Sequence, residues 1–281
     1  MSMSRIPLEQ LPTGIRRAIA DKTGAVHQAA TALGGVNSGI ASVLETESGR
    51  VFVKGIPTDH PQVGAQRREA AIAPHLPASC PRLYWHLELD GWSLLGYEVV
   101  DGRHADYAPD SPDLPLVEAA LTELQAVTAP AGIEIKDAAD RWADYAPPGT
   151  LQYFSGDTLL HTDFARDNVL IVGKQARLVD WAWPTRGAAW IDPGALTLRL
   201  MDSGHPVEDA IAFAGRFPSW RDAEPEALAA FGAATSALWR EIAAEDGTPW
   251  KQGMAKQAVT LGHILGAPTR VHRDGGRSSS R

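Results

Sequence analysis

The residues with the clearest chemical potential lie between positions 161 and 180. His161, Asp163 and Asn168 form a His-x-Asp-x-x-x-x-Asn pattern directly before the apolar run 169–172, and Asp180 follows a second short apolar run. Catalysis of phosphoryl transfer consists chiefly of positioning and charge neutralisation. One carboxylate can orient an attacking hydroxyl, whereas an Asn oxygen and a second carboxylate suit magnesium, which prefers oxygen ligands. The spacing therefore predicts a phosphoryl-transfer site at two neighbouring strand–loop junctions.

The first hundred residues predict an antiparallel sheet that carries one main helix. Turn signals at Ser48-Gly49 and Asp90-Gly91 separate apolar runs that favour strands, and Pro74 ends a helix-compatible segment. We expect a leading helix over 8–20, strands over 40–45, 51–53, 83–89 and 92–100, and a helix over 62–73. This order is typical of an α+β unit.

After a proline-rich connector at 101–115, the chain is predicted to be mainly helical with short strands. Helical spacing of apolar residues covers 116–127, 206–215, 225–244 and 250–265, and the strand-rich patch 158–180 contains the runs 169–172 and 177–179. We therefore predict an α+β fold with two domains, an N-lobe at 1–100 and a C-lobe at 101–281. The tail at 275–281 is expected to be disordered.

Composition excludes several function classes. The chain has 281 residues, 44% hydrophobic, with a formal charge of −8, which argues against a basic nucleic-acid-binding surface. Residues 1–100 hold nine acids and nine bases, whereas 101–281 hold 25 acids and 17 bases. Cys80 is the single cysteine, and no run resembles a signal peptide or a membrane span. We expect a cytoplasmic protein without nucleic-acid or membrane partners.

At the residues named above, the chain resembles the aminoglycoside phosphotransferase family, antibiotic kinases that share the two-lobed protein-kinase-like fold. His161 and Asp163 with Asn168 resemble the catalytic loop of the family, and Asp180 resembles its metal-binding acid. Asp192, in Ile191-Asp192-Pro193, resembles the Asp-Pro that follows. The resemblance continues upstream, since it spans roughly residues 34–200.

In the upstream part, Lys54 resembles the phosphate-binding lysine of the family and Glu69 its partner on the helix, while 97–102 occupies the place of the hinge. The resemblance implies that the nucleotide, ATP or GTP, lies between the lobes. The adenine of ATP would then form hydrogen bonds with backbone groups near Glu98 and Val100. It also implies that Lys54 holds the phosphates and that Glu69 orients Lys54.

For the catalytic side, the resemblance implies that Asn168 and Asp180 hold one or two Mg²⁺ ions. Asp163 would orient the acceptor hydroxyl as the catalytic base, and His161 and Asp192 would brace the catalytic loop.

Three features depart from the family pattern. The phosphate loop lacks a full Gly-x-Gly-x-x-Gly, although Gly34, Gly35 and Gly39 surround Ser38, whose hydroxyl could contact phosphates. Thr162 stands where a glycine is common, and it should be tolerated because its neighbours carry the chemistry. The metal-binding acid is followed by Trp-Ala-Trp and not by Phe-Gly.

The acceptor is predicted to be a small molecule and not a protein. Ala165 replaces the lysine of serine/threonine kinases, and only eleven residues separate Asp180 from Asp192, too few for a peptide-docking segment. The acid surplus favours a cationic acceptor, either an aminoglycoside or a cyclic peptide of the capreomycin/viomycin type, so that phosphorylation would confer antibiotic resistance. Candidate acids are Asp202, Glu208, Asp209, Asp222, Glu224, Glu226, Glu241, Glu245 and Asp246.

Two alternatives stay open. The same core would serve a metabolic kinase for an amino alcohol, a sugar or a homoserine-like acceptor, and a nucleotide-binding pseudokinase is a further possibility. Trp181, Trp183 and Trp190 follow the metal-binding acid, and we expect them in the core more than in contact with substrate.

Overall fold

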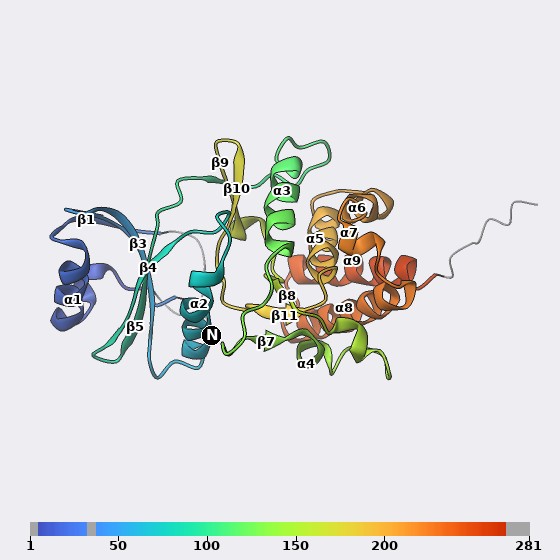
Figure 1. Ribbon diagram of the computed structural model, residues 1–281, viewed down its shortest axis with the longest axis horizontal. Helices are drawn as coiled ribbons and strands as arrows, with labels where there is room; N and C mark the ends of the chain where they lie inside the picture. The colour runs from blue at the N-terminus through green and yellow to red at the C-terminus, as the bar shows by residue number, and fades with distance from the viewer. Residues whose placement is uncertain (1–4, 33–37, 268–281) are drawn as a thin grey trace, which may run out of the picture.

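The computed structural model describes residues 5–32 and 38–267. A five-stranded antiparallel sheet lies at one end of the molecule and a mainly helical part lies at the other (Figure 1). The strand order is β1-β2-β3-β5-β4. The bounds are Val26–Thr31 for β1, Ile40–Thr46 for β2, Gly49–Pro57 for β3, Leu83–Leu89 for β4 and Trp92–Tyr97 for β5.

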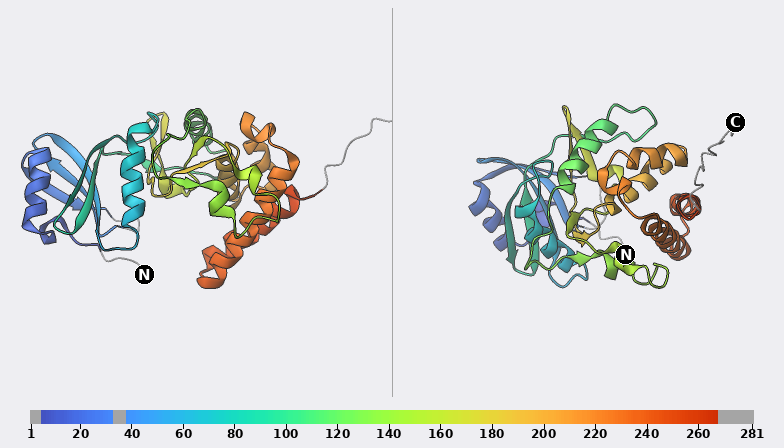
Figure 2. Two further views of the ribbon diagram at one scale, coloured as in Figure 1. Left: turned by 60° about the horizontal axis from the view of Figure 1, so that its bottom comes forward. Right: turned by 45° about the vertical axis from the view of Figure 1, so that its right-hand side comes forward.

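Two helices cover opposite faces of this sheet (Figure 2). Helix α1, Thr13–Thr23, buries Ile15 and Ile19 against Ile40, Leu44 and Val53 of the sheet. Helix α2, Val63–Ile72, contacts β3 and β5 from the other side. Because side chains alternate along a strand, the residue after Val53 points toward α2. This alternation directs a charged side chain of β3 into the space between the sheet and α2.

The predicted strands 40–45, 51–53 and 83–89 are confirmed, whereas the predicted strand 92–100 ends at Tyr97, and one further strand and the form of the leading helix differ from prediction. Asp90 and Gly91 have φ of 47° and 77°, the left-handed geometry that a two-residue hairpin turn requires. Strand β1 was missed because its short run lacks alternating large apolar residues, as suits an exposed edge strand. The leading helix was predicted as one piece, but Pro12 separates a 3₁₀ turn, Leu8–Gln10, from α1.

The second part combines helices with two small sheets. Its helices are α3 Leu114–Gln125, α4 Ala138–Trp142, α5 Ile191–Asp202, α6 Val207–Ala214, α7 Pro218–Arg221, α8 Pro225–Glu245 and α9 Pro249–Leu265. One sheet has the order β10-β9-β6, with Gln175–Leu178, Val169–Val172 and Arg103–His104. The other has the order β7-β11-β8, with Lys136–Asp137, Thr185–Gly187 and Thr158–Leu160. Further 3₁₀ turns are Ala73–His75, Leu151–Phe154 and Arg166–Asn168.

The long predicted helices correspond to α3, α6, α8 and α9, whereas α4, α5 and α7 were not predicted. Pro193 and Gly194 suggest a break in sequence, yet proline is tolerated in the first turn of a helix. Gly194 allows a close approach of α5 to α8, since a Cβ there would lie 2.6 Å from a ring carbon of Phe231. Helix α5 is therefore buried in the core of this part, beside the strand-rich patch.

The predicted α+β class is confirmed. Among the described residues, no helix is long and apolar enough to cross a membrane. Gly34, Gly35 and the tail 275–281 lie outside the described residues, so the predictions made for them have no structural counterpart here.

Candidate active site

The loop after β8 is tied to the first turn of α5. The carboxylate of Asp192 accepts hydrogen bonds from the backbone amides of His161 and Thr162, each at 2.9 Å. Asp192 is fully buried, and burial raises the pKa of its carboxyl to about 6, although the two amide bonds oppose that change. Helix α5 thereby fixes the backbone at the start of the loop that holds His161, Asp163 and Asn168.

The His161 ring connects the two strand–loop junctions. Its Nε2 lies 3.0 Å from the carbonyl oxygen of Val179, and its Nδ1 accepts from the amide of Asp163 at 3.3 Å. This pattern requires a neutral imidazole with its proton on Nε2. The ring is buried and meets Trp181 edge-on at 4.7 Å between centroids. His161 therefore braces the loop and does not face either large cavity of the site.

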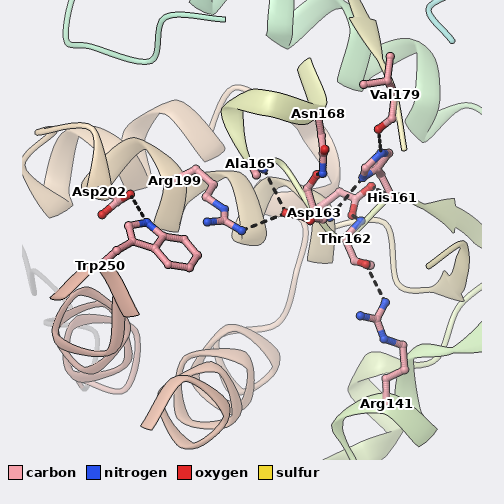
Figure 3. Close-up of polar contacts among 11 residues, drawn as sticks. Arg141, His161, Thr162, Asp163, Ala165, Asn168, Val179, Arg199, Asp202 and Trp250 are labelled. Atoms are coloured by element: carbon pink, nitrogen blue, oxygen red, sulfur yellow. Dashed lines mark hydrogen bonds and ion pairs between the residues drawn. The ribbon is translucent and has the colours of Figure 1, made fainter. Parts of the chain in front are cut away.

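Asp163 presents one carboxylate oxygen to the protein and leaves the other open (Figure 3). Its Oδ1 accepts from the amide of Ala165 at 3.1 Å and from Nη2 of Arg199 at 3.0 Å. No described residue bonds Oδ2, and the side chain is 45% exposed. Asp163 is therefore held in one orientation with an oxygen free to accept a hydrogen bond from a ligand.

Asn168 and Asp180 lie beside each other because the amide of Val179 donates to the carbonyl oxygen of Asn168 at 2.9 Å. The Asn168 side-chain nitrogen donates to the carbonyl of Asp163 at 3.3 Å, so its amide oxygen is directed away from that bond. Asp180 has a φ of 66° and a side chain that is 47% exposed. The pair thus offers oxygen atoms at the end of the second strand–loop junction.

Lys54 and Glu69 form a buried ion pair between β3 and α2. Nζ of Lys54 lies 2.7 Å from a Glu69 oxygen and 3.0 Å from Oδ1 of Asp180. The hydroxyl of Tyr97 donates to the other Glu69 oxygen at 3.0 Å. Burial disfavours the charged form of Lys54, but the two carboxylates outweigh it and raise its pKa. Lys54 is therefore a fixed cation at the junction of the two parts of the molecule.

A first cavity, of about 250 Å³, lies next to this ion pair and reaches the segment after β5. Its walls are mostly apolar, with Glu98 and Val100 at one side. Neither the carbonyl oxygen of Glu98 nor the amide of Val100 has a hydrogen-bond partner among residues 5–32 and 38–267. The Glu98 carboxylate bonds the guanidinium of Arg177 at 3.1 and 3.2 Å, so this side chain fastens the segment to β10. Ser38 lines a small neighbouring cavity together with Lys54 and Asp180.

A second cavity, of about 310 Å³, opens on the other side of the loop. Asp163 is the one carboxylate among its lining residues, and Arg141 and Arg199 are its two cations. The remaining lining is largely aromatic and aliphatic, and consists of Trp142, Thr162, Phe164, Trp183, Ala195, Leu198, Phe231, Thr235, Leu238, Trp239 and Ile242.

The sequence analysis missed Arg141 and Arg199 as site residues. Arg199 lies seven residues after Asp192, two turns along α5, so the two share the face toward the loop. A prediction of α5 would have exposed this signal. Arg141, on α4, is brought to the loop only by tertiary packing, and no local pattern distinguishes it.

The expectation that all three tryptophans lie in the core needs correction. Trp181 and Trp190 are buried as predicted, but Trp183 is 44% exposed and lines the second cavity. All the candidate acids are exposed and none of them lines that cavity, so they give the predicted cationic acceptor no support and it stays a prediction. They are Asp202, Glu208, Asp209, Asp222, Glu224, Glu226, Glu241, Glu245 and Asp246.

No protein-family model matches the sequence, and no curated protein does. Solved structures do match the fold. A thermostable mutant of aminoglycoside phosphotransferase APH(4)-Ia, solved in ternary complex with ADP and hygromycin B, aligns at a TM-score of 0.59 and 14% identity. The alignment covers 89% of this chain and 99% of that one.

The choline kinase LicA from Streptococcus pneumoniae aligns at a TM-score of 0.61 and 12% identity, over 89% of this chain and 98% of that chain. The chain has the two-lobed protein-kinase-like fold. The β1–β5 sheet with α2 forms the N-lobe of that fold, and Lys54, Glu69 and Asp180 meet where the lobes face each other. At these identities the similarity establishes the fold, and the activity must be argued from the site.

Proposed function

We propose that this protein is an ATP- and Mg²⁺-dependent kinase that transfers a phosphoryl group to a hydroxyl of a small molecule. One observation carries the proposal. Asp163 lies in the wall of the second cavity, while Lys54 and Asp180 line the first. Trp183 lines both the second cavity and the small cavity that contains Lys54 and Asp180. A donor in one cavity and an acceptor in the other would therefore meet at the loop that holds Asp163.

In this proposal the nucleotide occupies the first cavity. The carbonyl of Glu98 and the amide of Val100, which have no partner in the described part of the chain, would offer adenine one acceptor and one donor, and apolar side chains would enclose its faces. Lys54 is a charged group positioned by Glu69, as a phosphate ligand must be. Crystals of APH(4)-Ia with ADP support nucleotide binding by this fold.

The oxygen atoms of Asn168 and Asp180 fit Mg²⁺. Magnesium accepts one or two protein oxygen ligands and completes its shell with water and phosphate oxygens, and both side chains keep an oxygen without a partner among the described residues. When bound, Mg²⁺ would neutralise charge on the phosphates. Lys54 now contacts Asp180 directly, so that contact must loosen when phosphates enter.

Asp163 would act on the acceptor. Asp163 lines the second cavity, and its Oδ2, which has no partner among the described residues, could accept the hydrogen bond of an acceptor hydroxyl and so fix the direction of attack. His161 and Asp192 would keep the backbone of the loop in place, and neither of them lines either cavity. Their replacement should lower the rate without removing a reacting group.

The acceptor class is the finer part of the proposal. Hygromycin B in the APH(4)-Ia complex makes an antibiotic acceptor, with resistance as its consequence, a candidate for this chain. A cyclic peptide of the capreomycin/viomycin type is the other antibiotic candidate. The choline kinase match supports the alternative of a metabolic small-molecule kinase. Because the second cavity contains two arginines and one carboxylate, it does not favour a polycation in either case.

The decisive experiment measures ATP consumption with Mg²⁺ over a panel of hydroxyl-bearing acceptors. Asp163→Asn keeps the shape of the side chain but should lower turnover at least about 1,000-fold while nucleotide still binds. Asp167→Asn is a matched control, because this exposed acid lies four residues away in the same loop. Near-normal turnover of Asp163→Asn, or equal losses in both variants, would refute the role of Asp163. Expression in a sensitive bacterium would then test the antibiotic candidates.

A further inference from the structure

Three cations surround one tryptophan at the edge of the second cavity. The guanidinium carbons of Arg68 and Arg141 lie 5.9 and 5.7 Å from the centre of the Trp183 ring, and Nζ of Lys136 lies 5.6 Å from it. They come from α2, α4 and β7, so both lobes contribute. We call Arg68, Lys136, Arg141 and Trp183 the Trp183 cluster.

The positive charge of the Trp183 cluster is not neutralised. Within residues 5–32 and 38–267, no carboxylate lies within 4.0 Å of the charged nitrogens of these three side chains. Nε of Arg68 is buried and has no hydrogen-bond partner there. The face of one indole attracts a cation only weakly. Trp183 therefore cannot take the place of carboxylate partners for the three cationic side chains.

Arg141 is built into its position. Its Nη1 donates to the hydroxyls of Thr162 at 2.7 Å and of Thr185 at 2.6 Å. Thr162 has a φ of 66°, a left-handed conformation that is rare and strained for a β-branched residue. The threonine that replaces a glycine therefore has a use, because its hydroxyl holds Arg141. Figure 3 shows this contact beside Asp163.

The carboxylates closest to Arg141 already have partners. Asp163 bonds Arg199, and Asp192 accepts two backbone amides. Burial lowers the pKa of Arg141 to about 10, and these two acids only partly offset that effect. Arg141 is a half-buried cation in a cavity wall, and no carboxylate among the described residues forms an ion pair with it, so it should attract an anionic ligand.

We propose that the Trp183 cluster binds an oxyanion carried by the acceptor, a carboxylate or a phosphate. The acceptor would be a small molecule with a hydroxyl at Asp163, an apolar or aromatic body against the tryptophans of the second cavity, and its anionic group at Arg141. This inference rests on the proposed function for the role of Asp163, but the binding of the anion does not depend on phosphoryl transfer. The terminal phosphate of the nucleotide is the competing occupant.

The test uses the full chain and inorganic phosphate, with the nucleotide cavity filled by Mg²⁺ and AMP-PNP. Calorimetry should detect saturable phosphate binding by the wild type, weakened at least about tenfold in Arg141→Gln and partly preserved in Arg141→Lys. Phosphate binding to the wild type should also change the tryptophan fluorescence. Trp183→Phe should still bind phosphate but should lose this fluorescence change. Arg17→Gln is the matched control, because it removes an exposed arginine of α1 and should bind phosphate as the wild type does.

Lys136→Gln removes a cation of the cluster on a two-residue strand and gives an independent variant if Arg141→Gln does not fold. It should weaken phosphate binding about threefold or more. Absence of saturable phosphate binding in the wild type would overturn the proposal. Equal phosphate affinities of the wild type, Arg141→Gln and Lys136→Gln would overturn it as well. So would an Arg141→Gln chain whose affinity for Mg²⁺-AMP-PNP falls tenfold, since the cluster would then belong to the nucleotide.

A matched pair of ligands separates acceptor chemistry from simple ion binding. 4-Hydroxyphenylacetate should bind at least about tenfold more tightly than its neutral amide to the wild type, and the ratio should approach one in Arg141→Gln. Equal affinities in the wild type would contradict an anionic acceptor. These experiments measure binding, so they can detect the anion site even in a protein that shows no turnover. The turnover of Asp163→Asn tests the proposed function alone.

Discussion

Nη2 of Arg199 lies 3.0 Å from Oδ1 of Asp163, and this ion pair joins α5 to the loop after β8. The Arg199 guanidinium also lies 5.7 and 5.8 Å from the ring centres of Trp239 and Trp250. Asp163 therefore does not rotate freely in the cavity. Its orientation is set by an arginine that two tryptophans of neighbouring helices support.

Arg199 should act as a positioning residue. Arg199→Met should lower kcat about 10- to 100-fold and leave the KM for ATP within about twofold, because misplacement of the carboxylate affects the reacting geometry and not the nucleotide. Arg199→Lys should restore part of the rate, since its ammonium can still reach Asp163. Steady-state kinetics of both variants, with the exposed Arg240→Met as control, check this. A rise in the KM for ATP equal to the fall in kcat would contradict it.

The Lys54–Glu69 pair should affect both stability and activity. The two side chains are 13% and 5% exposed, so Glu69→Gln leaves Lys54 with one carboxylate and should lower the free energy of unfolding by about 3 kcal/mol. The variant should also bind ATP at least about tenfold more weakly, whereas Tyr97→Phe, which removes one bond to Glu69, should have a smaller effect.

The double variant Lys54→Met, Glu69→Leu separates these two roles. Urea unfolding should show much of the stability restored, because two apolar side chains can replace a buried ion pair. Turnover should stay absent in the same protein. A double variant that is as unstable as Glu69→Gln would contradict the role of the ion pair in stability. A double variant that retains turnover would contradict its role in activity.

Asp192 should make stability depend on pH. Burial raises the pKa of its carboxyl to about 6 in the folded chain, so its contribution is fully present below the unfolded value near 4 and is lost as pH rises through 6. The stability advantage of the wild type over Asp192→Asn should therefore shrink by about 1 kcal/mol between pH 5 and pH 7. Urea unfolding of both proteins at the two pH values measures it, and an advantage that grew with pH would have the wrong sign.

Thr162 and Thr185 hold the same nitrogen of Arg141 but differ in backbone conformation, so their replacements should differ in cost. Thr185→Val removes a bond to a charged group without relief of strain and should cost about 2–3 kcal/mol. Thr162→Gly also removes such a bond, but it relieves the left-handed φ and should cost less than about 1 kcal/mol. Thermal unfolding distinguishes the two, and equal costs would show that Thr162 is not strained.

Local sequence was sufficient for most of the scaffold. The strands from β2 to β5, with helix α2, could be predicted because apolar alternation and turn residues act over a few positions. The pattern of His161, Asp163 and Asn168 was recognisable for a similar reason, since these residues lie within eight consecutive positions of one loop. The pairing of Lys54 with Glu69 was implied by the family resemblance and not by local spacing, and the folded chain contains it.

Tertiary structure alone decided the character of the acceptor side. Arg199 reaches Asp163 from α5, 36 positions later in the chain, and Arg141 reaches Thr162 from α4, 21 positions earlier. Net charge placed a surplus of acids in the second part of the chain, but it could not tell which acids face solvent. The sequence by itself determined which residues share the candidate loop, because local spacing encodes it. The charge inside the cavity depends on which distant helices pack around it, and only the folded chain determines that.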